Sequence, residues 1–309
     1  MLDEEFDKVK RRLIACGFSL NDVKKIQYGL QFKAIFGEEE GIIRIFENKK
    51  TGIKIDTSLI KGSNLINKVK ACLEVENKRL NAKPSLLQNF DDKFDFYIGS
   101  DESGKGDYFG PLVVAGVMVS NENLCYLENL GIKDSKLLKE DKIFYLESEI
   151  INSKIPYKRI TLLPERYNKI YTDCLLQNTN LNDILAKAHC EVDRSFLNAS
   201  DKFKIVVDKF SINSGMDNMF ASFKNVKFLE VERSESKFLY VAAASILARA
   251  KFLRELKRLS KEIGFVLKRG SVNVAPLAQQ IVDANGFEGL KRVAKIHFKI
   301  TKDIKFEKC

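Results

Sequence analysis

This chain of 309 residues is best understood from the stretch Gly99-Ser100-Asp101-Glu102-Ser103-Gly104-Lys105-Gly106-Asp107-Tyr108-Phe109-Gly110-Pro111. It follows an alternating apolar run at 94–98 and leads into a nearly continuous apolar run at 111–119. These runs predict two strands, of which the second is buried on both faces. The acidic pair and the glycine-rich turn therefore lie at a strand end, where α/β proteins place their functional residues.

The spacing of Gly99, Gly104 and Lys105 approaches the phosphate-binding loop G-x4-G-K-[ST]. The match fails at the last position, because Gly106 replaces the Ser or Thr hydroxyl that binds Mg²⁺. Two acidic side chains inside the loop would also repel the phosphates of a nucleotide. The stretch is therefore not interpreted as a nucleotide-binding loop.

The acidic residues fit a metal site better. Side chains of neighbouring residues in a strand point to opposite faces, so Asp101 and Glu102 need partners from other segments to enclose one ion. Asp208, which ends a short apolar run, is one candidate, and Glu235, which precedes a helix predicted over 241–263, is another. Carboxylates without imidazole or thiolate favour hard cations such as Mg²⁺ or Mn²⁺. Such a set of carboxylates meets the requirement for hydrolysis of a phosphodiester by two metal ions.

Each of these acids also has an ordinary interpretation. Asp101 and Glu102 could belong to a solvated turn, Asp208 could end a strand, and Glu235 could be an exposed carboxylate at a helix start, where the helix dipole favours it. His189 is interpreted as a histidine satisfied in the core, or one that supports a site indirectly, rather than as a ligand. Asp107 and Asp134 are interpreted as turn or capping residues. The solvated face of a helix is the interpretation of four basic residues, Arg254, Lys257, Arg258 and Lys261.

The composition limits the class of protein. The 52 Lys and Arg residues exceed the 42 Asp and Glu residues, and the net charge of +10 favours a polyanionic partner without identifying it. No run approaches the roughly 18 apolar residues of a membrane span, and the acidic N-terminus does not match a signal peptide, so we expect a cytoplasmic protein without membrane contact. Six cysteines without a C-x-x-C pair, and only two histidines, favour reduced thiols over a zinc site or a disulfide framework.

The chain is expected to fold as two domains. Residues 1–80 predict a small α/β domain, with a helix over 6–16, strands near 28–36, 42–46 and 53–55, and a helix over 65–80. In the first strand, Tyr28, Leu30, Phe32, Ala34 and Phe36 are expected on the buried face. Residues 81–93 are the predicted linker, and residues 94–309 predict a larger α/β domain with further strands at 204–208 and 226–231 and helices at 181–196 and 241–263.

The polar face of the first domain carries Gln31, Lys33, Arg44 and Lys54. Such side chains could bind a nucleic-acid backbone through charge that does not depend on base sequence. A solvated sheet face is the alternative for each of them.

Several motifs, in this order, resemble the type 2 ribonucleases H and in particular ribonuclease HIII. The motifs are Asp101–Pro111, Lys133–Lys136, Val206–Phe210, Glu235–Ser236, Val241–Arg249 and Lys291–Phe298. The resemblance runs from about residue 94 to the end of the chain. The N-terminal segment resembles the TATA-binding-protein-like domain that distinguishes ribonuclease HIII from ribonuclease HII.

The resemblance implies an RNase H-like mixed sheet flanked by helices, preceded by a small α/β TATA-binding-protein-like domain. It places Asp101, Glu102 and Asp208 at metal-binding positions, and Glu235 at the fourth position, where ribonucleases HII usually have Asp. Ser103, Gly104, Lys105 and Gly106 fall on the turn whose backbone contacts the 2′-hydroxyl of RNA, and Ser135 and Lys136 would hold phosphates. Lys105 stands where ribonuclease HII sequences have Arg, which leaves recognition by the backbone unaffected.

The function implied is that of an endoribonuclease that uses two Mg²⁺ or Mn²⁺ ions to cut the RNA strand of RNA–DNA hybrids, leaving 5′-phosphate and 3′-hydroxyl ends. Cleavage at single ribonucleotides embedded in DNA, as by ribonuclease HII, is the alternative reaction. A non-catalytic hybrid-binding protein is the alternative of another class, disfavoured because binding alone needs no set of four carboxylates. We expect a monomer without an obligate protein partner.

Overall fold

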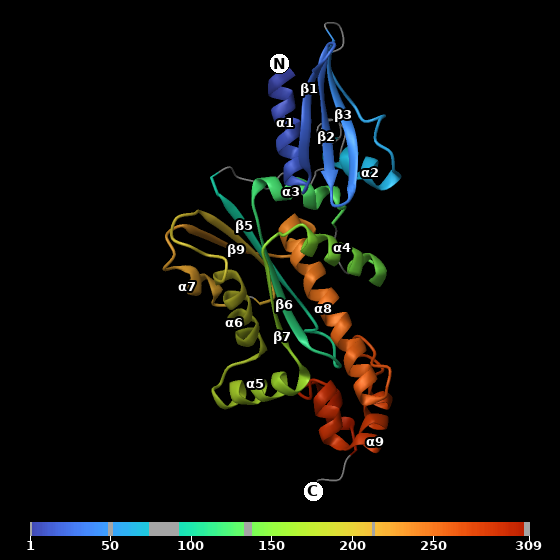
Figure 1. Ribbon diagram of the computed structural model, residues 1–309. Coiled ribbons are helices and arrows are strands. Elements are labelled where there is room, and N and C mark those ends of the chain that lie inside the picture. The colour runs from blue at the N-terminus through green and yellow to red at the C-terminus, as the bar shows by residue number, and fades with distance from the viewer. Residues whose placement is uncertain (1, 49–51, 74–92, 133–137, 212–213, 306–309) are drawn as a thin grey trace. The chain divides into compact units, whose positions relative to one another are not determined.

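The computed structural model describes residues 2–48, 52–73, 93–132, 138–211 and 214–305, which are drawn in colour in Figure 1. The chain forms two compact units, and each is described by itself. Unit 1 comprises Met1–Gln88 and Ser120–Gly131, and unit 2 comprises Asn89–Val119 and Ile132–Cys309. The predicted boundary after residue 80 and nearly all of the predicted linker lie outside the described residues, so that division stays a prediction.

Unit 1 is built on an antiparallel sheet with the strand order β1-β2-β3-β4. Its first elements are α1 (Leu2–Ala15), β1 (Ser19–Ile26), β2 (Gly29–Phe36), β3 (Glu39–Asn48), β4 (Gly52–Asp56) and α2 (Ser63–Leu73). Leu30, Phe32 and Ala34 are buried, and Phe32 and Ala34 belong to one apolar cluster with residues of α1 and α2. The two helices thus cover one face of the sheet, and the alternating side chains of β2 place Gln31 and Lys33 on the other.

The sequence pattern does not reveal β1 and misplaces Tyr28. β1 is an edge strand whose residues are mostly exposed, so it lacks the apolar alternation by which strands are recognised. Tyr28 is expected on the buried face, but it lies in the two-residue turn between Ile26 and Gly29, with a φ of 62°, and is 75% exposed. A residue in the turn does not follow the alternation of the strand, which explains the departure.

A third helix of unit 1 comes from the middle of the chain. This helix, α3 (Asn121–Asn129), is capped by Ser120 and packs against α1 and α2. Leu124 and Leu127 are buried, and Tyr126 packs against the apolar cluster of unit 1. The sequence-based division assigns this segment to the second domain, whereas its contacts place it in unit 1.

Unit 2 is built on a mixed sheet with the order β7-β6-β5-β8-β9. Its strands are β5 (Phe96–Ser103), β6 (Leu112–Val119), β7 (Tyr157–Leu162), β8 (Phe203–Asp208) and β9 (Val226–Val231). β6 pairs antiparallel with β5 and β7, whereas β5, β8 and β9 run parallel. Its helices are α4 (Glu140–Asn152), α5 (Pro164–Leu176), α6 (Leu181–Arg194), α7 (Met216–Phe220), α8 (Leu239–Ile263) and α9 (Ala275–Val293), with 3₁₀ helices η3 (Ser234–Ser236) and η4 (Lys299–Asp303).

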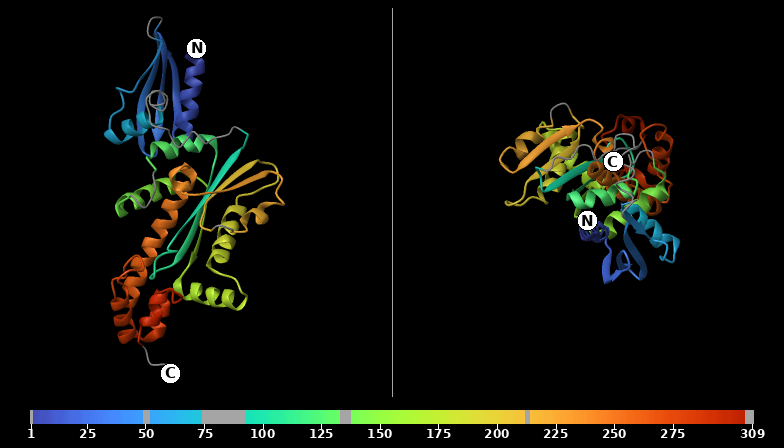
Figure 2. Two further views of the ribbon diagram at one scale, coloured as in Figure 1. Left: turned by 180° about the vertical axis from the view of Figure 1, so that it is seen from behind. Right: turned by 90° about the horizontal axis from the view of Figure 1, so that it is seen from above.

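Helices α6 and α8 cover opposite faces of the unit 2 sheet (Figures 1 and 2). α8 packs so closely on β5 that a Cβ added to Gly99 would lie 2.7 Å from the backbone of Tyr240. α6 packs on the other face, where a Cβ on Gly116 would lie 2.4 Å from a side-chain atom of Val192. The predicted α/β fold, a mixed sheet flanked by helices, is therefore confirmed. The small residues Ala242–Ala244, all fully buried, permit the close approach of α8.

Candidate active site

Two aspartates meet at the carboxyl ends of adjacent parallel strands. Ser100 of β5 pairs with Val207 of β8, so Asp101 and Asp208 come next along the two strands. Their alternation with Ser100 and Val207 gives them the same face of the sheet. Both line one cavity of about 240 Å³, and Asp101 is 6% exposed. The convergence of strand ends that the sequence predicts is therefore present in the fold.

Asp101 and Glu102 reach different helices, as the alternation along a strand requires. Asp101 accepts a hydrogen bond from the side chain of Ser245 on α8 and another, 2.8 Å long, from the backbone N–H of Glu102. The carboxylate of Glu102 lies instead 3.4 Å from Nε2 of His189 on α6. Both acids nevertheless line the same cavity, because it opens at the end of the strand.

The glycine-rich turn forms another wall of this cavity. Gly104 has a φ of 96°, and a Cβ there would lie 2.0 Å from the carbonyl oxygen of Pro111, so only glycine fits. Gly106 differs, because a Cβ added to it would meet no atom within 4 Å. Asp107 braces the turn by accepting a 2.6 Å hydrogen bond from the N–H of Gly270, in agreement with its interpretation as a turn residue.

Glu235 lies beside the cavity and is not among the residues that line it. It is buried in the short helix η3, where it is 4% exposed. The preceding residue, Ser234, donates its backbone N–H to Oδ1 of Asp208 over 2.8 Å. Glu235 therefore directly follows a residue whose backbone N–H is hydrogen-bonded to Asp208.

Burial and the charges of neighbouring carboxylates both act on Asp101. Its pKa is raised well above the usual value, first by burial, then by the negative charge of Glu102, with a smaller contribution from Asp208. The hydrogen bond from Ser245 opposes this rise. As placed here, no three His, Cys, Asp or Glu side chains of the described residues are arranged to hold one metal ion. The oxygen-only donors and their mutual repulsion nonetheless fit a hard divalent cation.

Two cavity residues carry no predicted role. Ser245 and Arg249 project from α8 and line the cavity with the acidic residues. They lie four residues apart, and so on one face of the helix, in the mostly apolar stretch 239–250. A polar pair at this spacing in an otherwise apolar stretch is the feature from which both residues could have been predicted to belong to the site.

The remaining predicted site residues lie elsewhere. Ser135, Lys136 and Asp134 are outside the described residues. In unit 1, Nε of Arg44 donates a 2.9 Å hydrogen bond to Oε1 of Gln31 across β2 and β3, and Nζ of Lys33 lies 3.1 Å from a carboxylate oxygen of Glu40. Lys54 on β4 is exposed, and its backbone pairs with Phe46 of β3. The structure thus brings these four residues onto one sheet.

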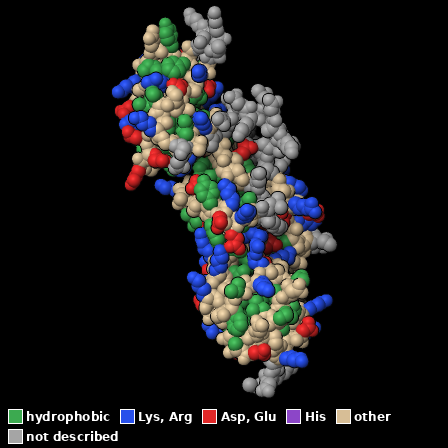
Figure 3. Space-filling model, turned by 90° about the vertical axis from the view of Figure 1, so that its right-hand side faces the viewer, with side chains coloured by type: hydrophobic (Ala, Val, Ile, Leu, Met, Phe, Trp, Pro, Cys, Tyr) green, Lys and Arg blue, Asp and Glu red, His purple; other side chains and the backbone are tan. Residues whose placement is uncertain are grey.

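Arg254 and Lys257 of α8 are exposed but paired with acids. Figure 3 shows Lys and Arg side chains gathered on the face of unit 2 that carries α4 and α8. A carboxylate oxygen of the fully buried Glu147 lies 2.6 Å from Arg254, and its other oxygen lies 2.6 Å from Arg159 of β7. Lys257 pairs with Glu140 at 2.8 Å. This face of α8, which is predicted to be solvated, therefore also carries ion pairs that join α8 to α4.

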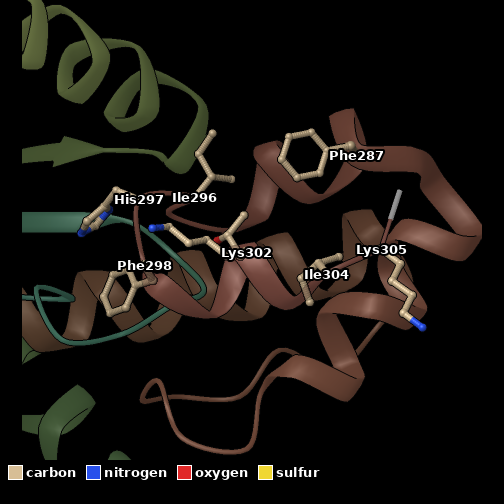
Figure 4. A pocket seen from close by; sticks show the side chains of 8 residues that line it. Phe287, Ile296, His297, Phe298, Lys302, Ile304 and Lys305 are labelled. Atoms are coloured by element: carbon tan, nitrogen blue, oxygen red, sulfur yellow. The ribbon is translucent and has the colours of Figure 1, made fainter. Parts of the chain in front are cut away.

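A second cavity, of about 590 Å³, lies at the C-terminal end of unit 2 (Figure 4). Phe287 of α9 lines it together with residues from the segment 296–305, among them His297 and Phe298. None of the residues predicted to carry the chemistry contributes to it. Of the metal and substrate residues predicted in unit 2, those that the structure describes line the first cavity, except Glu235.

Comparison with known proteins agrees with this geometry. The family model described as Ribonuclease HII matches residues 98–301. The chain belongs to this family. Among its curated relatives, ribonuclease HIII of Phytoplasma mali (strain AT) is 41% identical over 66% of this chain and 71% of its own length, and ribonuclease HIII of Streptococcus agalactiae serotype Ia is 35% identical over 66% and 70%. The resemblance to ribonuclease HIII is therefore confirmed, and with it the prediction of a ribonuclease H enzyme.

Solved structures of the family share the fold. Bst-RNase HIII in complex with Mn²⁺ aligns with a TM-score of 0.59 over 97% of this chain and 94% of that chain, at 24% identity. RNase H3 of Aquifex aeolicus aligns with a TM-score of 0.52 over 96% and 97%, at 26% identity. Within the described part of this ribonuclease H, no helix is long and apolar enough to cross a membrane.

Proposed function

We propose that this ribonuclease H is an endoribonuclease that hydrolyses the RNA strand of RNA–DNA hybrids, using two divalent cations and leaving 5′-phosphate and 3′-hydroxyl ends. One observation carries the proposal: the carboxylates of Asp101 and Asp208 and the open backbone at Gly106 line a single cavity. A phosphodiester of RNA offers two features side by side, the phosphate and the 2′-hydroxyl. The carboxylates suit the phosphate through bound cations, and the open backbone at Gly106 suits the 2′-hydroxyl.

The proposed cation ligands are Asp101, Glu102, Asp208 and Glu235. Their oxygen-only chemistry suits Mg²⁺ or Mn²⁺, and a cation would stabilise the ionised form of Asp101, whose pKa is raised by burial and then by the charge of Glu102. The four carboxylates would hold two such cations, which would supply an activated water molecule and stabilisation of the leaving oxygen of the phosphodiester. The complex of Bst-RNase HIII with Mn²⁺ supports the proposal of a divalent cation.

The chain itself orients these carboxylates. Oδ1 of Asp101 accepts the N–H of Glu102, and Oδ1 of Asp208 accepts the N–H of Ser234. Charge-assisted hydrogen bonds to backbone N–H groups restrict the rotation of each carboxylate. The two aspartates are thus oriented by the backbone before any cation is present.

Recognition of RNA is assigned to the backbone of Ser103, Gly104, Lys105 and Gly106. The space beside Gly106 allows a sugar to approach main-chain groups closely, and the 2′-hydroxyl distinguishes RNA from DNA. The side chain of Lys105 is engaged elsewhere, because its Nζ donates a 3.1 Å hydrogen bond to the carbonyl oxygen of Phe210. This favours a role for its backbone. Ser135 and Lys136 remain the proposed phosphate contacts.

The polar sheet face of unit 1 is the proposed second contact with the hybrid. Arg44 and Gln31 present a hydrogen-bonded pair, and the exposed Lys54 adds a positive charge. Lys33 is paired with Glu40, so we expect it to contribute less. Contacts of this kind read the backbone and not the bases.

Cleavage of a hybrid with Mg²⁺ or Mn²⁺ tests the proposal. Asp101→Asn and Asp208→Asn keep the shape of each side chain but remove its charge, and we expect each to lower kcat roughly 1,000-fold, or about 4 kcal/mol in activation free energy. Asp283→Asn, at an exposed carboxylate of α9, is the control and should cleave like the native chain. Undiminished cleavage by both site variants would show that the cavity is not the active site.

A single ribonucleotide embedded in duplex DNA is the alternative substrate, since the matching family model is that of ribonuclease HII. The polar sheet face of unit 1 favours the continuous hybrid, because a second site can contact a longer stretch of the duplex. Rates on the two substrates, measured with one preparation, decide between them. A higher rate on the single ribonucleotide would reverse the assignment.

A further inference from the structure

A buried line of polar side chains lies behind Glu102, on the α6 face of the sheet. Oγ of Ser100 lies 2.8 Å from Nδ1 of His189 and 3.1 Å from Oδ2 of Asp193. Nε2 of the same histidine lies 3.4 Å from Oε2 of Glu102. Ser100, His189 and Asp193 are fully buried, whereas Glu102 lines the cavity. The line therefore begins in the core and ends at a proposed cation ligand.

Secondary structure fixes this alignment. Ser100 and Glu102 are two residues apart on β5 and so share one face of the strand. His189 and Asp193 are four residues apart on α6 and so share one face of the helix. The ring of Phe210 stacks on the imidazole with the centroids 5.4 Å apart and the planes at 13°. The imidazole is thus held at Nδ1 and on one ring face, while Nε2 lies 3.4 Å from Oε2 of Glu102 without forming a hydrogen bond to it.

The positions of the protons follow from hydrogen-bond counting. The Ser100 hydroxyl has one proton, which it donates either to Asp193 or to His189. If it donates to Asp193, Nδ1 must donate to Ser100, and Nε2 must also carry a proton, since a buried lone pair would otherwise face the carboxylate of Glu102. If it donates to His189, Asp193 must be protonated to donate to Ser100, and the proton of the ring is on Nε2.

The two arrangements contain the same number of protons, and both place a hydrogen on Nε2, which lies 3.4 Å from Oε2 of Glu102. Burial raises the pKa of Asp193 to about 7, against the opposing effects of His189 and Ser100, so a protonated Asp193 is accessible at neutral pH. Nε2 of His189 therefore carries a hydrogen in either arrangement.

We propose that His189 is a positioning residue for the reaction: its Nε2–H is the donor that orients the Glu102 carboxylate when that carboxylate binds a divalent cation, and Ser100 and Asp193 fix the orientation of the ring. The proposal rests on the proposed role of Glu102 as a cation ligand. Partners that orient a ligand in this way typically contribute 10- to 100-fold to metal affinity. Oε1 of Glu102 lies 3.9 Å from Nζ of Lys105, so the two oxygens of the carboxylate lie near different side chains.

Three variants and a control test this role in the full chain. His189→Leu removes the N–H with little change in volume, His189→Gln keeps an amide N–H near the position of Nε2, and Ser100→Ala breaks the link to Asp193. Cys190→Ala, at the next residue of α6, removes a buried side chain that packs in an apolar cluster and serves as the control. Unfolding curves establish that each variant is folded.

The first readout is Mn²⁺ affinity, measured by calorimetry without substrate. We expect His189→Leu to weaken Mn²⁺ binding by about 10- to 100-fold, and Ser100→Ala to weaken it less. His189→Gln should recover most of the affinity, and Cys190→Ala should bind Mn²⁺ as the native chain does. In hybrid cleavage at a fixed Mn²⁺ concentration, the same loss should appear in kcat with the KM for the hybrid unchanged. Native affinity in a folded His189→Leu variant would overturn the proposal.

The second readout is the ring of His189 itself. The chain has only two histidines, so ¹⁵N spectra of the imidazoles contain two sets of signals, and His297→Gln identifies those of His189. We expect a protonated Nε2 at neutral pH, and a change in the His189 signals but not the His297 signals when Mg²⁺ is added. An Nε2 without a proton would overturn the proposal even if His189→Leu failed to fold.

Failure of this proposal is distinguishable from failure of the proposed function. Glu102→Gln tests the ligand itself in the same calorimetric assay. If Glu102→Gln weakens Mn²⁺ binding while His189→Leu does not, only the positioning role is wrong. If Glu102→Gln binds Mn²⁺ as the native chain does, the ligand role of Glu102 is wrong, and the role of His189 is wrong with it.

Discussion

The backbone N–H of Ser234 donates a 2.8 Å hydrogen bond to Oδ1 of Asp208, and this bond ties helix η3 to the end of β8. The hydroxyl of the same serine lies 3.3 Å from the same oxygen. Asp208 therefore has two tasks. It contributes charge to the cavity, and it anchors the short helix that carries Glu235.

The two tasks of Asp208 can be separated by substitution. Asp208→Asn keeps an oxygen acceptor for Ser234, whereas Asp208→Ala leaves that buried N–H without this acceptor. We expect the free energy of unfolding, measured with denaturant and a chelator, to be lower in the Ala variant than in the Asn variant by about 1–3 kcal/mol. Both variants should lose hybrid cleavage. Equal stability of the two would mean that the bond does not anchor η3.

The two glycines of the turn should respond differently to substitution by alanine. Gly104→Ala places a Cβ 2.0 Å from the Pro111 carbonyl oxygen at a positive φ, so we expect a loss of stability of several kcal/mol. Gly106→Ala has open space and should unfold like the native chain. Its effect should instead be a raised KM for the hybrid. A Gly106→Ala variant with native KM would argue against contact between this turn and the RNA.

Salt dependence should reveal the contacts made by unit 1. If Lys54 contacts a phosphate, Lys54→Ala should make the plot of log affinity for the hybrid against log salt concentration shallower by about 0.9 or less. Lys33→Ala should change the slope less, because Glu40 already neutralises part of that charge. Lys10→Ala, at an exposed position of α1, is the matched control. Equal slopes for the native chain and Lys54→Ala would place this lysine away from the hybrid.

Lys295 should make stability depend on pH. It is fully buried, its Nζ donates a 2.6 Å hydrogen bond to the carbonyl oxygen of Gly110, and burial lowers its pKa from 10.5 to about 7. Between pH 7 and about 10 the unfolded chain binds a proton that the folded chain does not. The free energy of unfolding contributed by this group therefore rises with pH in that window, by up to about 1.4 kcal/mol per unit.

Lys295→Met removes this contribution. The difference in unfolding free energy between the native chain and the variant, followed from pH 7 to 10 by denaturant unfolding, isolates the lysine from the tyrosines and cysteines that titrate in the same range. Lys299→Met, at an exposed lysine nearby, should leave the pH dependence of the native chain unchanged. A pH-independent difference for Lys295→Met would show that the buried amine does not titrate near neutrality.

The meeting of Asp101 and Asp208 could be predicted, because each ends a recognisable apolar strand and parallel strands end at one edge. The contact between Glu102 and His189 could not, since it depends on how α6 lies across β5, and helix packing has no short-range signal. The edge strand β1 was hidden for another reason: its residues are mostly exposed, and so lack a pattern. Sequence periodicity thus reports burial, and it fails where an element is exposed or where two elements cross.

Helix α3 belongs to unit 1 but follows β5 and β6 of unit 2 in the sequence. The chain leaves unit 1, contributes β5 and β6 to unit 2, and returns to unit 1 for Ser120–Gly131. During translation from the N-terminus, the strand that bears Asp101 therefore emerges before the helix that completes the N-terminal core. The N-terminal core is therefore complete only after β5 and β6 have been synthesised. Dividing the gene near residue 80 would separate α3 from α1 and α2, against which it packs.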